Sequence, residues 1–159
     1  MQMKRPTKHQ KLLAVYDQFF AAIDGTDSDI GRQFVESWKS KREEYASPSA
    51  TDRPSELAAG MEEELRDFLM RLASEIRTPD GQPASRALHA ALANNYPDFI
   101  VTQERQLDAI LAKGRIASEK QFALVRSAID VAEGDPQARG RLVELYRLVD
   151  VYDARARRR

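Results

Sequence analysis

Residues 114–152 read GRIASEKQFALVRSAIDVAEGDPQARGRLVELYRLVDVY, and this stretch decides the fold class. Apolar residues recur in both of its halves at alternating spacings of three and four, as on one face of an α-helix. These residues are Phe122, Val125, Ile129 and Ala132, followed by Leu142, Leu145, Val149 and Tyr152. Because so short a turn joins the two stripes, the sequence predicts an antiparallel helical hairpin over residues 116–153.

Helix start and stop signals frame both halves of this hairpin. Gly114 can close the helix before it, and Ser118–Gln121 has the spacing of a capping box. Gly134 ends the first stripe. Asp135 and Pro136 then supply an N-cap and a first-turn proline for the last helix.

Helical spacing also runs through the rest of the chain, with no convincing alternation of period two. It predicts helices from the capping box Thr7–Gln10 to Gly25, from residues 26–29 to 45, and over 57–76, 85–94 and 98–114. The fold class is therefore all-α: one domain, residues 1–159, forming an antiparallel bundle of six or seven helices with the 57–76 helix at its centre. We expect a hinge loop at 46–54 and an arginine-rich tail at 154–159.

Composition agrees with a globular domain. The chain has 159 residues, of which 42% are hydrophobic and 31% charged, and its formal net charge is zero. No apolar run approaches the roughly 20 residues of a membrane-spanning helix, and the N-terminus does not read as a secretory signal. The sequence predicts a cytoplasmic protein without membrane partners.

The usual catalytic constellations are incomplete. There is no cysteine, the histidines are His9 and His89 alone, and no phosphate-binding glycine loop or Gly-x-Ser-x-Gly elbow occurs. We therefore predict no catalytic residues, no cofactor and no resident metal.

One acidic run offers an enzymatic alternative. Glu64 and Asp67 are three positions apart and could face one divalent ion, with Glu63 beside them. Residues 63–69 (EELRDFL) resemble the second acidic motif of all-α nucleotide pyrophosphohydrolases of the MazG type, which implies magnesium-dependent phosphohydrolysis. The Glu-x-x-Glu pair of that family is missing from the preceding helix. The other interpretation is a solvated helix face beside a leucine stripe.

Arginines near the C-terminus make nucleic acid a further possible partner. They are Arg139, Arg141, Arg147, Arg155, Arg157 and Arg158, and acidic residues alternate with them. Guanidinium groups at these positions could contact phosphates.

The hairpin itself carries a second local resemblance. It is similar to the leading helical hairpin of host-inhibition-of-growth-type antitoxins, in which a DNA-binding helix-turn-helix comes next in the chain. The matching positions are Ile116, Ser118, Glu119, Phe122, Ile129, Asp130, Gly134, Asp135, Pro136, Leu142, Leu145, Leu148, Val149, Tyr152 and Asp153. This resemblance implies protein–protein contact through the hairpin.

Aromatic residues of the second helix are the remaining candidates for a partner surface. Phe34, Trp38 and Tyr45 lie on one narrow stripe beside the expected hinge, where they form either core or a docking groove. Taken together, the sequence predicts a non-catalytic helical interaction, adaptor or regulatory protein. It would bind a protein partner or a second copy of itself.

Overall fold

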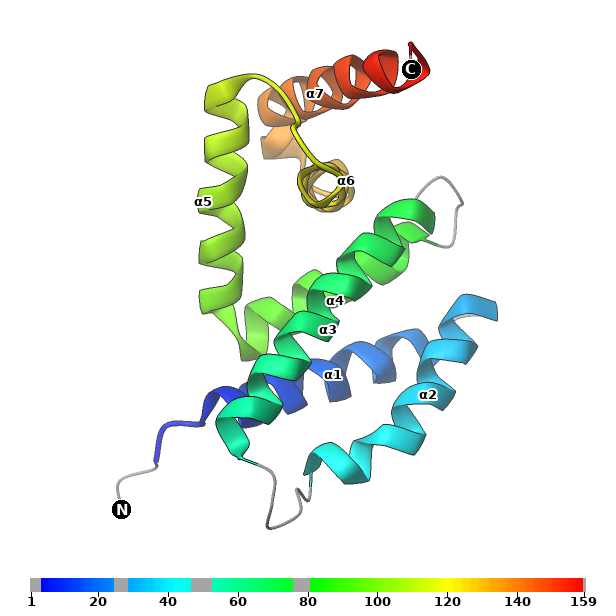
Figure 1. Ribbon diagram of the computed structural model, residues 1–159, viewed down its shortest axis with the longest axis vertical. Coiled ribbons are helices and arrows are strands. Elements are labelled where there is room, and N and C mark those ends of the chain that lie inside the picture. The colour runs from blue at the N-terminus through cyan, green and yellow to red at the C-terminus, as the bar shows by residue number, and fades with distance from the viewer. Residues whose placement is uncertain (1–3, 25–28, 47–52, 76–80, 159) are drawn as a thin grey trace.

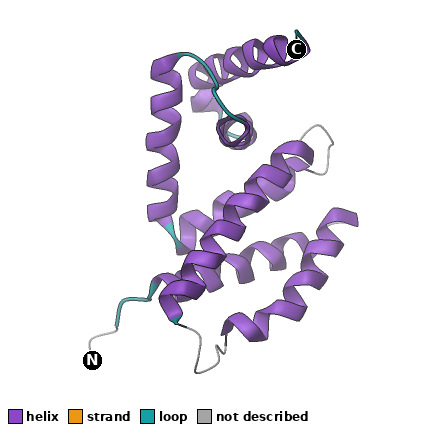
Figure 2. Ribbon diagram, viewed as in Figure 1, coloured by secondary structure: helices purple, strands orange, loops and turns teal. Residues whose placement is uncertain are grey.

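A computed structural model describes residues 4–24, 29–46, 53–75 and 81–158. Within these ranges the chain forms helices and no strand, which confirms the all-α prediction (Figures 1 and 2). The helices are α1 (Lys8–Asp24), α2 (Asp29–Ala46), α3 (Pro54–Glu75), α4 (Gly81–Asn95), α5 (Pro97–Lys113), α6 (Glu119–Glu133), the 3₁₀ turn η1 (Pro136–Ala138) and α7 (Arg139–Arg157).

The predicted helix caps at Thr7, Gly114 and Ser118 are confirmed. At α1, the Gln10 N–H donates to the Thr7 hydroxyl at 3.2 Å, and the Thr7 N–H donates to the Gln10 side chain at 2.9 Å. At α6, the Gln121 N–H donates to the Ser118 hydroxyl at 3.2 Å. Gly114 closes α5 with a left-handed φ of 71°, which a residue without Cβ adopts at little cost.

Several boundaries differ from the sequence predictions. The ends of the predicted hinge loop 46–54 are helical, because α2 ends at Ala46 and α3 begins at Pro54 instead of residue 57. Helix α4 begins at Gly81, not at residue 85, because Pro83 falls in the first turn, where a backbone N–H has no helical acceptor. Asp135 and Pro136 begin η1, which leads into α7. The arginine-rich end is helical through Arg157, since cations favour the negative end of the helix dipole.

Several predicted features fall outside the described residues. They include the Gly25 helix end, the hinge residues 47–52, and residue 76 at the end of the predicted 57–76 helix. The side chain of Phe34 is likewise not described.

Buried apolar residues form two clusters. The first joins α1, α2, α3 and α4 around Tyr16, Phe19, Trp38 and Met61. The second joins α5, α6 and α7 around Leu107, Val125, Ile129 and Leu145, as the hairpin stripes predict. Helix α6 bridges these regions, because it packs against α3, α4, α5 and α7 (Figure 1). It therefore shares the central position that the sequence predicted for α3.

Tyr16 ties the first cluster together with a buried hydrogen bond. Its hydroxyl donates to the Met61 carbonyl oxygen at 2.6 Å, joining α1 to α3, and its ring lies 5.1 Å from that of Trp38. Burial of the hydroxyl raises the pKa of Tyr16, so the group stays a neutral donor.

We expect Tyr16→Phe to lower the free energy of unfolding by about 1 kcal/mol, because the variant keeps the ring and loses one buried hydrogen bond. Tyr152→Phe is the matched control, since the half-buried Tyr152 hydroxyl bonds to no other described residue. Urea denaturation of both variants measures the difference; equal losses would contradict this role for Tyr16.

Candidate functional site

Of the aromatic residues predicted as a partner surface on α2, Trp38 belongs to the first cluster and Tyr45 packs against it, while the side chain of Phe34 lies outside the described part. Trp38 is 7% exposed, and its ring lies 5.3 Å from Phe20 and 6.0 Å from Tyr45. Tyr45 is half-buried and donates its hydroxyl to Glu64 at 2.8 Å; burial, followed by this bond, raises its pKa to about 12. The burial of Trp38 therefore favours the interpretation that this stripe is part of the hydrophobic core and not a docking groove.

The carboxylates of the acidic run on α3 form ion pairs with neighbouring helices and with α3 itself. Glu62 pairs with Lys8 of α1. Glu64 receives the Tyr45 hydroxyl and an ion pair from Lys41 of α2 at 3.4 Å, whereas Glu63 pairs with Arg66 at 3.2 Å. Arg66 also pairs with Glu62 at 3.8 Å, so each of the three carboxylates already has a cationic neighbour. No group of three potential metal ligands occurs among the described residues. The geometry favours a role in joining helices.

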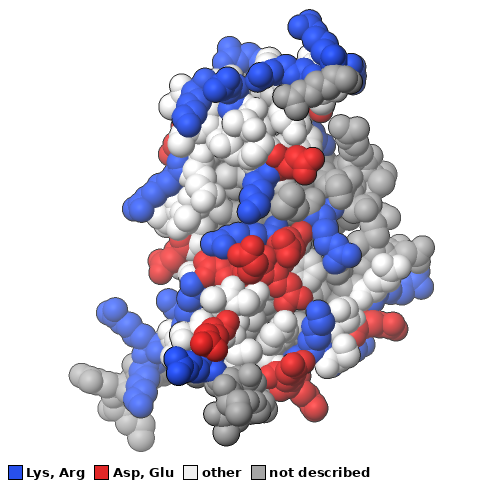
Figure 3. Space-filling model, viewed as in Figure 1, with Lys and Arg blue, Asp and Glu red and all other residues white. Residues whose placement is uncertain are grey.

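Asp67 and Glu63 do share the wall of a wide cleft between α3, α5 and α6. Its volume is about 560 Å³, and Asp98, Lys113 and Lys120 also line it. Acidic side chains gather near the middle of this face of the molecule, where α3 crosses (Figure 3). The cleft is therefore lined by both acidic and basic side chains. Glu64 is not among its lining residues.

The predicted nucleic-acid arginines divide into two groups. Arg141 turns inward and pairs with Glu104 of α5 at 2.7 Å. The others are exposed along or just after α7: Arg139, Arg147, Arg155, Arg157 and Arg158. Basic side chains accordingly mark the α7 end of the molecule in Figure 3.

Helix α7 also carries most of the exposed large hydrophobic side chains. Val143, Tyr146 and Val151 are 70%, 38% and 45% exposed, opposite the buried face of Leu145 and Val149. The Tyr146 hydroxyl bonds to Glu133 of α6. The sequence predictions covered only the buried stripe and missed these exposed residues, because their spacings of three and five do not follow a single helical stripe.

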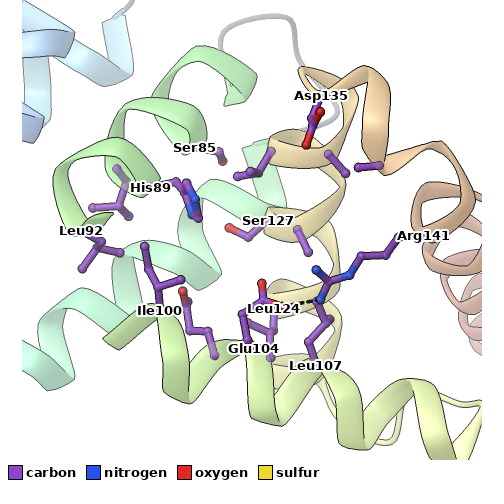
Figure 4. Close-up of a pocket in the computed structure, with 16 residues that line it drawn as sticks. Ser85, His89, Leu92, Ile100, Glu104, Leu107, Leu124, Ser127, Asp135 and Arg141 are labelled. Carbon is purple, nitrogen blue, oxygen red and sulfur yellow. Dashed lines mark hydrogen bonds and ion pairs between the residues drawn. The ribbon is translucent and has the colours of Figure 1, made fainter. Parts of the chain in front are cut away.

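A smaller pocket lies between α4, α5 and α6 and is bordered by η1 and the start of α7 (Figure 4). Its volume is about 150 Å³. Apolar residues form most of its wall: Leu88, Leu92, Ile100, Leu107, Leu124, Ala128, Val131, Ala132 and Ala138. Polar groups enter from Ser85, His89, Gln103 and Ser127, and burial lowers the pKa of His89, so its imidazole is neutral at pH 7.

Two buried polar side chains beside this pocket lack partners. The Ser85 hydroxyl on α4 and both carboxylate oxygens of Asp130 on α6 make no hydrogen bond to any described residue. Ser85 is 3% exposed and Asp130 is fully buried. Burial raises the pKa of the Asp130 carboxyl, and the nearby Ser85 hydroxyl and Arg126 oppose this only in part. The Asp130 backbone carbonyl, in contrast, accepts a bond from Arg86 at 3.0 Å.

Comparisons with protein-family models, curated proteins and solved structures find no match to this chain. In the described part of the chain, no helix has the length and apolar content needed to span a membrane. The two local resemblances therefore remain predictions, and the function has to be inferred from the surfaces and pockets of the fold.

We expect millimolar Mg²⁺ to leave the thermal midpoint unchanged to within about 1 °C, because cationic or hydroxyl neighbours already hold the Glu63 and Glu64 carboxylates. Ca²⁺ at equal ionic strength controls for general screening. A rise specific to Mg²⁺ that Asp67→Asn removes would instead support a metal site on α3.

We expect Asp130→Asn to raise the free energy of unfolding at pH 7, since it removes a carboxylate that is costly to ionise in the folded state. The folded pKa lies above the ordinary value near 3.8, so the folded state holds its proton more tightly than the unfolded chain. The free energy of unfolding of the parent protein should therefore fall as the pH rises from about 3.8, the ordinary pKa, through the higher pKa of Asp130 in the folded state.

Urea denaturation from pH 4 to pH 7 measures the effect. The gain from Asp130→Asn should shrink toward pH 4, where the carboxyl is protonated in the folded state. Asp150→Asn, on the exposed face of α7, is the matched control. A gain independent of pH would show that ionisation of Asp130 does not limit stability.

Proposed function

We propose that this protein is a non-catalytic helical interaction protein that docks an acidic amphipathic helix of a protein partner on the outward face of α7. One observation carries the proposal: Val143, Tyr146 and Val151 are exposed on the helix that also displays the exposed arginines. The exposed Arg147 and Asp150 lie between these apolar residues along the helix, and such a mixture of apolar and charged side chains also occurs in protein-binding surfaces.

The position of α7 supports this role. Helix α7 packs on α6, η1 and α5, and it lies at the edge of the molecule, so its opposite side faces outward (Figure 1). The buried residues Leu145, Leu148 and Val149 hold it to the second cluster. A rigid helix therefore presents Val143 and Val151 two turns apart, a spacing that suits the apolar stripe of a second helix.

Charge indicates the chemistry of the partner. Exposed arginines at 139, 147, 155, 157 and 158 outnumber the exposed acids Glu144 and Asp150 on this helix. Carboxylates flanking the apolar stripe of a partner would meet these guanidinium groups, which speeds association and sets orientation.

Nucleic acid fits the same surface less well. Val143 is 70% exposed near the N-terminal end of α7 and would face phosphates without a favourable contact, while Glu144 and Asp150 would repel them. Arg141 is engaged by Glu104. The phosphohydrolase alternative is supported still less, because Glu63 and Glu64 bind cations of their own chain.

A photo-crosslinking residue at Val151 should capture a protein partner in cells of the source organism, and Val143→Asp should reduce that adduct by about tenfold or more. The substitution places a carboxylate in the apolar contact and leaves every arginine intact. The adduct is identified by mass spectrometry, and its crosslinked segment should be an acidic amphipathic helix.

Val101 on α5 provides the matched control, because it is 49% exposed and lies outside α7. A crosslinker at Val101 should give no such adduct, and Val101→Asp should not affect capture at Val151. Capture of nucleic acid, or an adduct that survives Val143→Asp, would refute the proposal. Capture of a second copy would assign the face to self-association, which light scattering of the purified protein checks independently.

A further inference from the structure

The pocket between α4, α5 and α6 combines features of a ligand site. It is separate from the outward face of α7, so a ligand in it would bind independently of the proposed function. We propose that this pocket binds one small neutral molecule with a ring-sized apolar body and a hydroxyl or amide group that hydrogen-bonds to Ser85.

The size of the pocket sets the size of the ligand. A volume of about 150 Å³ equals that of an engineered apolar protein cavity known to accept benzene. Leucine and isoleucine side chains from three helices, including Leu88, Ile100 and Leu124, supply an apolar wall for such a body.

Ser85 sets the polar requirement. Ser85 is 3% exposed and lines the pocket, and its hydroxyl makes no hydrogen bond to a described residue, although it lies near enough to the Asp130 carboxyl to lower the pKa of that group. A buried hydroxyl without a partner costs free energy that a ligand donor or acceptor would recover. Figure 4 shows Ser85, His89 and Ser127 around the same space, so the neutral imidazole and a second hydroxyl can complete the polar contacts.

Charge around the pocket favours a neutral ligand. Glu104 and Arg141 at its border neutralise each other across 2.7 Å, and Asp135 adds a further carboxylate. An anion would meet Asp135 without a free guanidinium from Arg141. A cation would have to leave water for a mostly apolar wall, which is costly.

Titration of the ¹⁵N-labelled full chain with phenol, toluene and benzoate tests the proposal. Phenol should give saturable amide shifts confined to residues 85–92, 100–107 and 124–132. Toluene has the same ring without the hydroxyl and should bind about tenfold more weakly, while benzoate should not bind. Absence of saturable phenol shifts in these segments would overturn the proposal.

Two variants locate the contact. Ser85→Ala should weaken phenol binding by about tenfold and leave toluene unchanged, because only the hydroxyl contact is lost. Ala128→Leu should abolish binding of both by filling the pocket. Ser40→Ala, at an exposed serine of α2, is the matched control and should change nothing.

The amide spectrum of each variant without ligand shows whether it is folded. If Ala128→Leu disturbs the fold, the ratio of phenol to toluene affinity in Ser85→Ala decides alone. Equal phenol affinity in Ser85→Ala and the parent protein would refute the assigned role of Ser85.

Discussion

The burial of α6 between its neighbours is the constraint on which the rest of the structure depends. One face of α6 carries Val125 and Ile129 into the second cluster, where α5 and α7 pack. Its other side carries small residues, including Ala123 and Ser127, and meets α3 and α4. Small side chains let helices approach closely, so α6 joins the two clusters with little apolar bulk. This second contact ties the α6–α7 hairpin directly to α3 and α4.

The same burial creates the unusual chemistry beside the pocket. Asp130 lies on α6 where α4 packs, so its carboxyl is fully buried and has a raised pKa. Ser85 approaches from α4 and is equally without a described partner. Polar groups in such positions reduce stability, and they persist in proteins where a ligand, a solvent molecule or a function compensates for them. The packing of α6 on α4 therefore both lowers stability, by burying Ser85 and Asp130, and leaves a polar group that a ligand can bind.

Charged residues on α3 show how tertiary contacts change the meaning of a local motif. Along the chain, residues 62–67 present carboxylates at helical spacing, and this spacing alone suggested a shared metal ion. In the folded protein, Glu62 reaches Lys8 and Glu64 reaches Lys41 and Tyr45, so these carboxylates join α3 to α1 and α2. Spacing defines which side of a helix a residue occupies, whereas its partners come from distant parts of the chain.

The amino-acid sequence by itself determined the all-helical class, the hairpin stripes and the caps at Thr7, Gly114 and Ser118, because these depend on interactions within a few residues. It left Trp38 between core and surface, and it gave no sign that Arg141 would turn toward Glu104 or that Asp130 would be buried. Only the tertiary structure decided the burial of Trp38 and Asp130 and the pairing of Arg141. It also decided that no described helix packs over Val143 and Val151, which are exposed. Burial and pairing depend on which helices meet, and those contacts join residues far apart in the chain.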